Sequence, residues 1–245
     1  MIGIGPGNPR QITLEAIDAI AACDVFFLLD KGARVQQLSR ARTELLAAYA
    51  PAGHRVVVID DPPRDRDPDD YRAEVQRWHT ARVDALETAI IESVDAGQSC
   101  AFLVWGDPAL YDSTLRLVDQ LVARGSVDLE VEVIPGVTSA SALTAAHGIV
   151  AHGIGEPVLL TTGRRLVDAA VEEPANRIVM LDSHLTFTQT ARSDDDVYWG
   201  ANLGTPEQVL ISGKVSDVAD EIEQARARLR QQTGWVMDIY LLRRR

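Results

Sequence analysis

The stretch Ser99–Thr114, SCAFLVWGDPALYDST, decides the fold. Its residues Cys100–Val104 form a short, wholly apolar run, which is typical of a strand buried on both faces of a parallel sheet. Pro108 lacks a backbone N–H and biases Asp107 toward an extended conformation, so the strand ends before them. Asp107 therefore lies in a loop just after the carboxyl end of a buried strand, where open α/β sheets place their ligands. The loop is either a ligand site or a capped turn into the next helix.

The order of predicted elements around this stretch indicates two domains. Before it, strands alternate regularly with helices, which predicts a mostly parallel sheet covered by helices. After it, strands crowd together with shorter helices, which predicts a mixed sheet. We therefore predict an α/β protein with domains at residues 1–118 and 119–245 and an active-site cleft between them. The predicted strands are 25–29, 55–59, 100–104, 129–134, 158–161, 177–181, 197–199, 209–212 and 235–242.

Composition and charge exclude several classes of function. The chain is 46% apolar and 24% charged with a net charge of −12, which disfavours a nucleic-acid partner. No apolar run approaches the roughly 20 residues of a membrane span. Cys23 and Cys100 lie in apolar contexts without a leader sequence, so we expect a reduced, cytoplasmic location. The five histidines lack metal-ligand spacing, so we predict no metal site.

The chain opens on a glycine loop, MIGIGPGNP. Gly3, Gly5 and Gly7 let the backbone turn sharply and approach a ligand closely. The loop is not the dinucleotide-binding fingerprint, because prolines interrupt it before the helix begins. Only Met1-Ile2 precede Gly3, so we expect the sheet to lack most of the strand that leads into the loop.

Four short motifs occur in a fixed order along the chain: Gly3–Gly7 (GIGPG), Gly106–Pro108 (GDP), Ile134–Ser139 (IPGVTS) and Thr205–Gln208 (TPEQ). Together they resemble the tetrapyrrole (corrin/porphyrin) methylases, which are two-domain α/β enzymes that use S-adenosylmethionine. The resemblance covers nearly the whole chain, and four ordered motifs are far more specific than one. It implies S-adenosylmethionine as methyl donor, no metal, a small-molecule tetrapyrrole substrate and a homodimer.

Three further segments resemble one branch of that family: Val25–Gly32, Val75–His79 and Gly234–Arg243. Enzymes of this branch methylate C-1 of precorrin-5 and release its acetyl group as acetate, in aerobic cobalamin (vitamin B12) biosynthesis. Two alternatives stay open. The chain could be a methylase of the same fold acting elsewhere, at another ring carbon or on the modified histidine of a translation factor. It could also be a non-catalytic paralogue that only binds S-adenosylmethionine.

The resemblance also implies a set of cofactor contacts, most of them made by the backbone. Matched residue by residue, they fall on Trp105, Gly106, Asp107, Leu110, Thr138, Ser139, Leu181, Asp182, Asn202 and Leu203. Asp107 is the strongest individual candidate. Methyl transfer from a sulfonium requires aligned reactants and excluded water rather than a metal ion.

Deacetylation requires a general base for water and hydrogen-bond donors for the developing oxyanion. The catalytic candidates are Asp107, Tyr111 and Asp112, and Asp182 and His184 are further candidates for the base. Each of them is alternatively a helix cap, a satisfied polar group or a surface residue.

Arginines of the first half can attract the carboxylates that a tetrapyrrole would carry: Arg10, Arg34, Arg64, Arg66, Arg72 and Arg77. Several of them surround the segment Asp60–Asp70, DDPPRDRDPDD, which is too polar and rich in proline to pack. That segment is either a lid that orders over the substrate or a solvated charge run.

Overall fold

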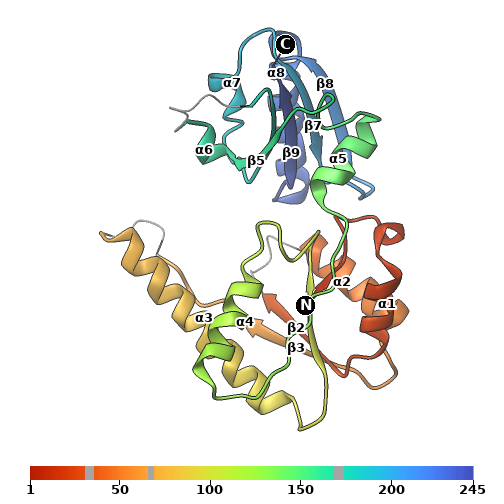
Figure 1. Cartoon of the computed structure of the whole chain (residues 1–245), viewed down its shortest axis with the longest axis vertical. Coiled ribbons are helices and arrows are strands. Elements are labelled where there is room, and N and C mark those ends of the chain that lie inside the picture. Colours follow the sequence, from red (N-terminus) through yellow and green to blue (C-terminus); the bar gives the residue numbers. More distant parts are fainter. Residues whose placement is uncertain (31–35, 66–68, 168–173, 245) are drawn as a thin grey trace. The chain divides into compact units, whose positions relative to one another are not determined.

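The computed structural model describes residues 1–30, 36–65, 69–167 and 174–244 (Figure 1). The chain forms two compact units: unit 1 contains Met1–Gly5 and Pro9–Val137, and unit 2 contains Pro6–Asn8 and Thr138–Arg245. The main passage between units thus falls after Val137, later than the predicted 118/119 boundary. That boundary lies inside helix α4 (Thr114–Arg124), whose Leu117, Val118 and Leu121 are all buried in the core of unit 1.

Unit 1 is built on a four-stranded parallel sheet in the order β1-β4-β2-β3. Its strands are β1 (Ile2–Gly3), β2 (Val25–Asp30), β3 (Arg55–Asp60) and β4 (Cys100–Val104). Its helices are η1 (Pro9–Gln11), α1 (Leu14–Ala21), α2 (Gln36–Tyr49), α3 (Tyr71–Ser93) and α4. Helices α1 and α2 pack on one face of the sheet, and α3 and α4 pack on the other (Figure 1).

Strand β4 has the two buried faces that its apolar run predicts. Ala101 and Leu103 pack into the cluster beneath α1 and α2, while Phe102 and Val104 pack into the cluster beneath α3 and α4. All four side chains are buried. Because both faces are covered, the strand cannot alternate with polar residues. The prediction of a doubly buried strand is confirmed.

The glycine loop enters the sheet through β1, which has two residues and is paired on both edges. Ile2 and Gly3 lie beside β4, and on the other edge the Gly3 N–H donates to the Ile134 carbonyl at 2.9 Å. The predicted strand 129–134 is wrong, because only Ile134 forms a bridge with β1. Its alternating pattern suits a half-exposed strand, but a two-residue neighbour offers too short a ladder.

Unit 2 is built on a mixed five-stranded sheet in the order β5-β6-β9-β7-β8. Its strands are β5 (Val158–Thr162), β6 (Asn176–Met180), β7 (Asp196–Ala201), β8 (Val209–Lys214) and β9 (Asp238–Arg243). Strands β5, β6 and β7 run in one direction, because β5 is parallel to β6 and β9 is antiparallel to both β6 and β7. Their carboxyl ends therefore lie on one edge. The prediction of a mixed second sheet is confirmed.

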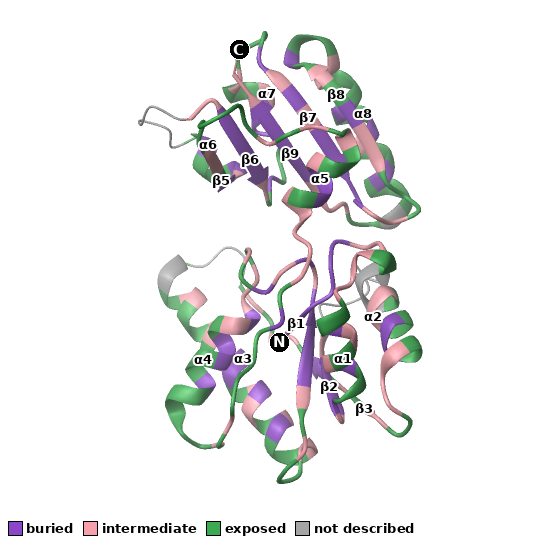
Figure 2. Cartoon of the chain, turned by 45° about the vertical axis from the view of Figure 1, so that its right-hand side comes forward, coloured by how far each residue is buried: buried purple, intermediate pink, exposed green. Residues whose placement is uncertain are grey.

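Helices cover both faces of this sheet: α5 (Ser139–His147), α6 (Gly163–Val167), α7 (Phe187–Thr190) and α8 (Val215–Thr233). Helix α5 packs on one face, and α6, α7 and α8 pack on the other. Strand β9 serves both sides, with Tyr240 and Leu242 facing α8 and with Ile239 and Leu241 facing α5. Buried residues accordingly follow the strands in Figure 2. Among the described residues, no helix is long and apolar enough to span a membrane.

Candidate functional site

Four glycines bring three motifs together at the carboxyl edge of unit 1. Gly5 and Gly106 exchange backbone hydrogen bonds at 2.9 and 3.2 Å. A Cβ at Gly3 would lie 2.6 Å from the Gly136 nitrogen, and a Cβ at Gly136 would overlap the Gly106 carbonyl oxygen. Only glycine fits at Gly3 and Gly136, because a side chain there would push the backbones apart, and at Gly106 a φ of 71° favours glycine.

Asp107 fastens that crossing. Its Oδ2 accepts the Gly136 N–H at 2.9 Å, and its Oδ1 accepts the Ala109 N–H at 2.8 Å. The carboxylate thus joins the loop after β4 to the IPGVTS motif, with a charge-assisted bond to each side. The neighbouring cofactor candidates frame the same loop. Trp105 packs against the core cluster of β1, and the Leu110 N–H donates to the Asp107 carbonyl at 3.1 Å.

Asp112 and Tyr111, the other catalytic candidates, differ in what surrounds them. Asp112 accepts the Thr114 N–H at 2.6 Å and so caps α4, whose N-cap Ser113 makes no capping bond through its own side chain. Tyr111 is 44% exposed and has a left-handed backbone, with φ at 55°. No hydrogen bond of its hydroxyl is present among the described residues. A strained, exposed tyrosine of this kind is typical of a functional loop.

In unit 2, the remaining cofactor candidates gather at the carboxyl edge of the sheet. Thr138 caps α5 by accepting the Ser141 N–H at 3.1 Å, and Ser139 reaches the Met180 sulfur at 3.9 Å at the end of β6. Leu181 follows with φ at 53° and 65% of its surface exposed. An exposed leucine in the left-handed region is held there at a cost of about 1–3 kcal/mol by its surroundings.

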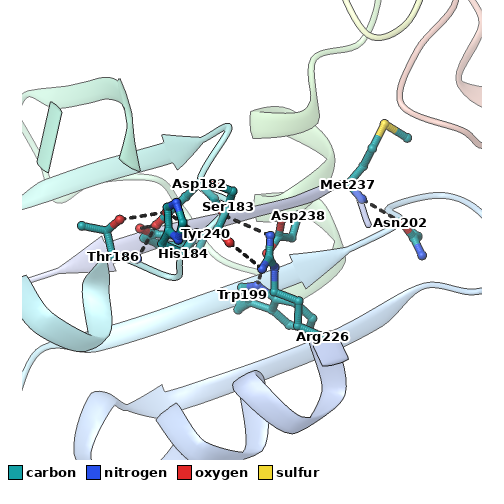
Figure 3. Close-up of polar contacts among 10 residues, drawn as sticks. All are labelled: Asp182, Ser183, His184, Thr186, Trp199, Asn202, Arg226, Met237, Asp238 and Tyr240. Carbon is teal, nitrogen blue, oxygen red and sulfur yellow. Dashed lines mark hydrogen bonds and ion pairs between the residues drawn. The ribbon is translucent and has the colours of Figure 1, made fainter. Parts of the chain in front are cut away.

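Asp182 points inward instead of toward a ligand. Its carboxylate accepts the Thr186 N–H at 2.6 Å, the Thr186 hydroxyl at 2.8 Å, the His184 N–H at 3.1 Å and the Tyr240 hydroxyl at 2.6 Å (Figure 3). The side chain also covers Gly163, where no Cβ would fit. Internal hydrogen bonds therefore occupy this carboxylate, and they shape the turn after β6. The His184 side chain is exposed.

Asn202 is the candidate whose side chain has unused hydrogen-bonding capacity. The residue is 1% exposed with φ at 48°, and its Oδ1 accepts the Met237 N–H at 3.2 Å. Its Nδ2 is buried and finds no partner among the described residues. A buried amide donor without a partner is costly, so this atom fits a ligand acceptor. Leu203 beside it is buried in the core beneath α5.

The glycine loop also reaches this edge. Asn8 belongs to unit 2, and a Cβ at Gly204 would lie 2.6 Å from its nitrogen. The start of the TPEQ motif is tied to the same turn, since the Thr205 hydroxyl donates to the Asn202 carbonyl at 2.8 Å. Unit 2 thus places parts of three motifs beside the candidate residues.

Sequence reasoning missed a second layer of polar residues, which comes from α8 and β9. Arg226 donates through Nε to Asp238 at 2.8 Å, and Trp199 donates to the same carboxylate at 3.2 Å (Figure 3). Burial raises the pKa of Asp238, and the Arg226 guanidinium opposes that rise. Burial, with the Asp182 carboxylate, also raises the pKa of Tyr240, so the phenol remains a donor. The Trp-Val-Met-Asp-Ile-Tyr ending was the available signal.

The described part of the segment 60–70 lies along α3. Its contacts join Asp61 to Arg82, Pro62 to Trp78, Pro63 to Arg77 and Asp65 to Glu74. A lid movement of residues 61–65 would have to break these contacts with α3.

Some of the arginines proposed for substrate carboxylates already have partners within this region. Arg77 pairs with Glu74 at 2.6 Å and lowers the pKa of that carboxyl to about 2, and Arg64 lies over the Trp78 ring. Arg34, Arg66 and the Arg72 side chain lie outside the described residues.

Comparison with known proteins identifies the family. The family model of the Tetrapyrrole (Corrin/Porphyrin) Methylases matches residues 1–219. The chain belongs to the tetrapyrrole methylases.

Two relatives show how far the similarity extends. The chain is 41% identical over 245 residues to precorrin-6A synthase [deacetylating] of a Sinorhizobium species, covering 100% of this chain and 94% of that protein. It matches the crystal structure of the cobalamin synthesis related protein CobF from Corynebacterium diphtheriae with a TM-score of 0.86 and 37% identity, covering 99% and 96% of the two chains. The structure of the cobalt precorrin-4 methyltransferase CbiF shares the fold alone, with a TM-score of 0.67 and 20% identity. These matches confirm the fold class of this tetrapyrrole methylase.

The described residues contain no group of three His, Cys, Asp or Glu side chains placed to hold a metal ion. The edge of unit 1 offers the exposed Tyr111, and the edge of unit 2 offers the left-handed backbone of Leu181 and the Asn202 Nδ2, which is unpaired in the described part of the chain. Each edge by itself presents groups that can contact a ligand by hydrogen bonds and shape.

Proposed function

We propose that this tetrapyrrole methylase is an S-adenosylmethionine-dependent C-methyltransferase that converts precorrin-5 to precorrin-6A, methylating C-1 and releasing acetate, in cobalamin biosynthesis. The observation that carries the proposal is the 41% identity, along the whole chain, to precorrin-6A synthase [deacetylating]. The 0.86 TM-score to the CobF structure supports the same branch of the family.

The residues present fit the proposed cofactor. The Nδ2 of Asn202, which has no partner among the described residues, offers a donor at the edge where the exposed Leu181 has a left-handed backbone. S-Adenosylmethionine, when bound, supplies a methyl group on a sulfonium, which is an electrophilic carbon. We propose that Trp105–Leu110, Thr138 and Ser139, Leu181 and Asp182, and Asn202 and Leu203 hold it, chiefly through backbone groups.

The chain's own residues have mainly to align the reactants and exclude water. We propose that Asp107 and Asp112 act by holding the loop after β4, because their oxygens accept backbone N–H groups. Tyr111 is the group that we propose to contact substrate, since its exposed hydroxyl can donate to the oxyanion that forms when water attacks the acetyl carbonyl.

The test is incubation of the protein with precorrin-5 and methyl-labelled S-adenosylmethionine. The expected result is one labelled methyl group on the product and one equivalent of acetate. Methylation without acetate would instead indicate action at another ring position. Binding of S-adenosylhomocysteine without turnover on any tetrapyrrole would indicate a non-catalytic paralogue.

We further expect a homodimer that works in the cytoplasm on this one small-molecule substrate. Light scattering coupled to size-exclusion chromatography measures the mass in solution, and a monomeric mass would contradict the dimer. Fractionation of the producing cell tests the location.

A further inference from the structure

The carboxyl edge of unit 2 is braced from behind by one short segment, Met237–Tyr240. Met237 exchanges hydrogen bonds with Asn202, since the Asn202 N–H donates to the Met237 carbonyl at 2.8 Å and Met237 donates to Asn202 Oδ1. Three residues along, the Tyr240 hydroxyl donates to Asp182. The segment therefore touches both loops that carry the cofactor candidates of β6 and β7 (Figure 3).

Arg226 of α8 completes this brace. Its Nε donates to Asp238, its Nη1 donates to the Ser183 carbonyl at 2.9 Å, and its Nη2 donates to the Asp182 carbonyl at 3.2 Å. One rigid guanidinium thus spans from the start of β9 to the turn after β6. Its planar fork fixes two successive carbonyls at once, which lysine cannot do.

We propose that Arg226, oriented by Asp238, is a positioning residue that fixes the turn at residues 181–183 for cofactor binding. The inference rests on the proposed function, in which this turn contacts S-adenosylmethionine. The C=O and the following N–H of a peptide unit point in opposite directions. By holding the carbonyls of Asp182 and Ser183, Arg226 therefore also sets the direction of the Ser183 N–H, and it supports that of the His184 N–H, which donates to the Asp182 carboxylate.

Backbone strain explains why the turn needs such a hold. Leu181 and Leu185 both have left-handed backbones, with φ at 53° and 51°. Conformations of this kind persist only where the surroundings over-determine them. Leu185 is 5% exposed and anchored in the core, whereas Leu181 is 65% exposed and lacks that anchor. The bonds of Arg226 to the Asp182 and Ser183 carbonyls hold the chain beside Leu181, together with the bonds that the Asp182 carboxylate accepts from Thr186, His184 and Tyr240.

Stability alone does not account for the pair of Arg226 and Asp238. Their side chains are 16% and 6% exposed, so both charges are largely desolvated. An apolar pair of similar size often stabilises a core equally well. What the charged pair provides, and an apolar pair could not, is a guanidinium oriented to donate to two carbonyls.

The decisive variant is the double substitution Arg226→Met with Asp238→Asn, which removes the fork without leaving a buried carboxylate unpaired. An asparagine can still accept the Trp199 N–H. Arg228→Met is the matched control, because Arg228 is exposed on the same helix. The measurements are the Kd of S-adenosylhomocysteine by calorimetry, the Tm, and amide exchange of residues 181–186.

We expect the double variant to bind S-adenosylhomocysteine about 3- to 30-fold more weakly, the range of coupling that a residue outside the ligand shell exerts. Exchange in 181–186 will be faster, the KM for S-adenosylmethionine will rise more than kcat falls, and the control will match the wild type. Arg226→Lys, which keeps a positive charge beside Asp238, will show the same loss of affinity for S-adenosylhomocysteine. This variant replaces the double variant in the test if the double variant does not fold.

A double variant and an Arg226→Lys variant that both bind like the wild type overturn the inference while the proposed function stands. An equal loss of affinity in Arg228→Met overturns it as well. A wild-type protein with no affinity for S-adenosylhomocysteine overturns the proposed function, and the inference falls with it.

Discussion

Replacing Asp107 tests whether the loop after β4 works through its position. In Asp107→Ala, the N–H groups of Gly136 and Ala109 both lose their acceptor. The Gly136 N–H is partly buried, and losing a charge-assisted bond there costs about 1.5–3 kcal/mol. The Ala109 N–H is exposed, so water replaces the carboxylate at little cost.

The sum is a loss of about 2–3 kcal/mol in the free energy of unfolding, or about 4–12 °C in Tm for a chain of this size. Because the Gly106 crossing loses its tie at the same time, the Kd of S-adenosylhomocysteine will rise together with the loss of stability. The Tm and the Kd of Asp107→Asn will lie between those of the wild type and of Asp107→Ala. The amide keeps one acceptor oxygen, but it presents a donor to the other N–H.

Differential scanning calorimetry and titration calorimetry on the same samples make the test, with Asp119→Ala on the exposed face of α4 as control. A weaker Kd with an unchanged Tm would refute this reasoning, because it would mean that the carboxylate contacts the ligand directly and does not hold the loop. An unchanged Kd with a lower Tm would remove the loop from the cofactor site.

Four further expectations follow from other residues. Gly136→Ala will prevent folding of unit 1, because its Cβ meets backbone. Gly125 is a left-handed helix cap with open space around it, so Gly125→Ala will lower the free energy of unfolding by only about 1 kcal/mol. Soluble yield and Tm distinguish the two variants. Asp112→Ala will lower the free energy of unfolding by about 1 kcal/mol through loss of the cap, measured by denaturant titration. Tyr111→Phe will slow acetate release about 100-fold with an unchanged Tm, and equal rates would exclude the hydroxyl from catalysis. Burial raises the pKa of Cys23 from 9.0 to about 11, so the folded state keeps the thiol proton to a higher pH than the unfolded state does. This contribution to the free energy of unfolding is complete below pH 9, and about 2–3 kcal/mol of it is lost by pH 11. Denaturant titrations across this range will show a smaller fall in the free energy of unfolding for Cys23→Ala.

Sequence alone determined the strands, the faces that they bury and the order of the glycine motifs. The apolar runs at 100–104 and at Ile239–Leu242 of β9 are local signals, because burial on both faces of a strand requires each side chain in turn to be apolar. Threonine at the start of a helix is likewise a local signal, and Thr13 and Thr138 both cap helices. Local signals failed at 129–134, where a correct alternation had no strand long enough to pair with.

Only the tertiary structure decided what each polar group does. Asp107 and Asp182 are both carboxylates after buried strands, yet the first bridges to Gly136, 29 residues away, and the second turns inward to Tyr240, 58 residues away. Arg226 reaches a turn 43 and 44 residues before it. A polar side chain takes the partner that folding brings within about 3 Å, and no pattern of neighbours in the sequence encodes that choice. For the same reason, the Asn202 Nδ2 can be recognised as a donor without a partner among the residues described only once the groups around it have been placed by the fold.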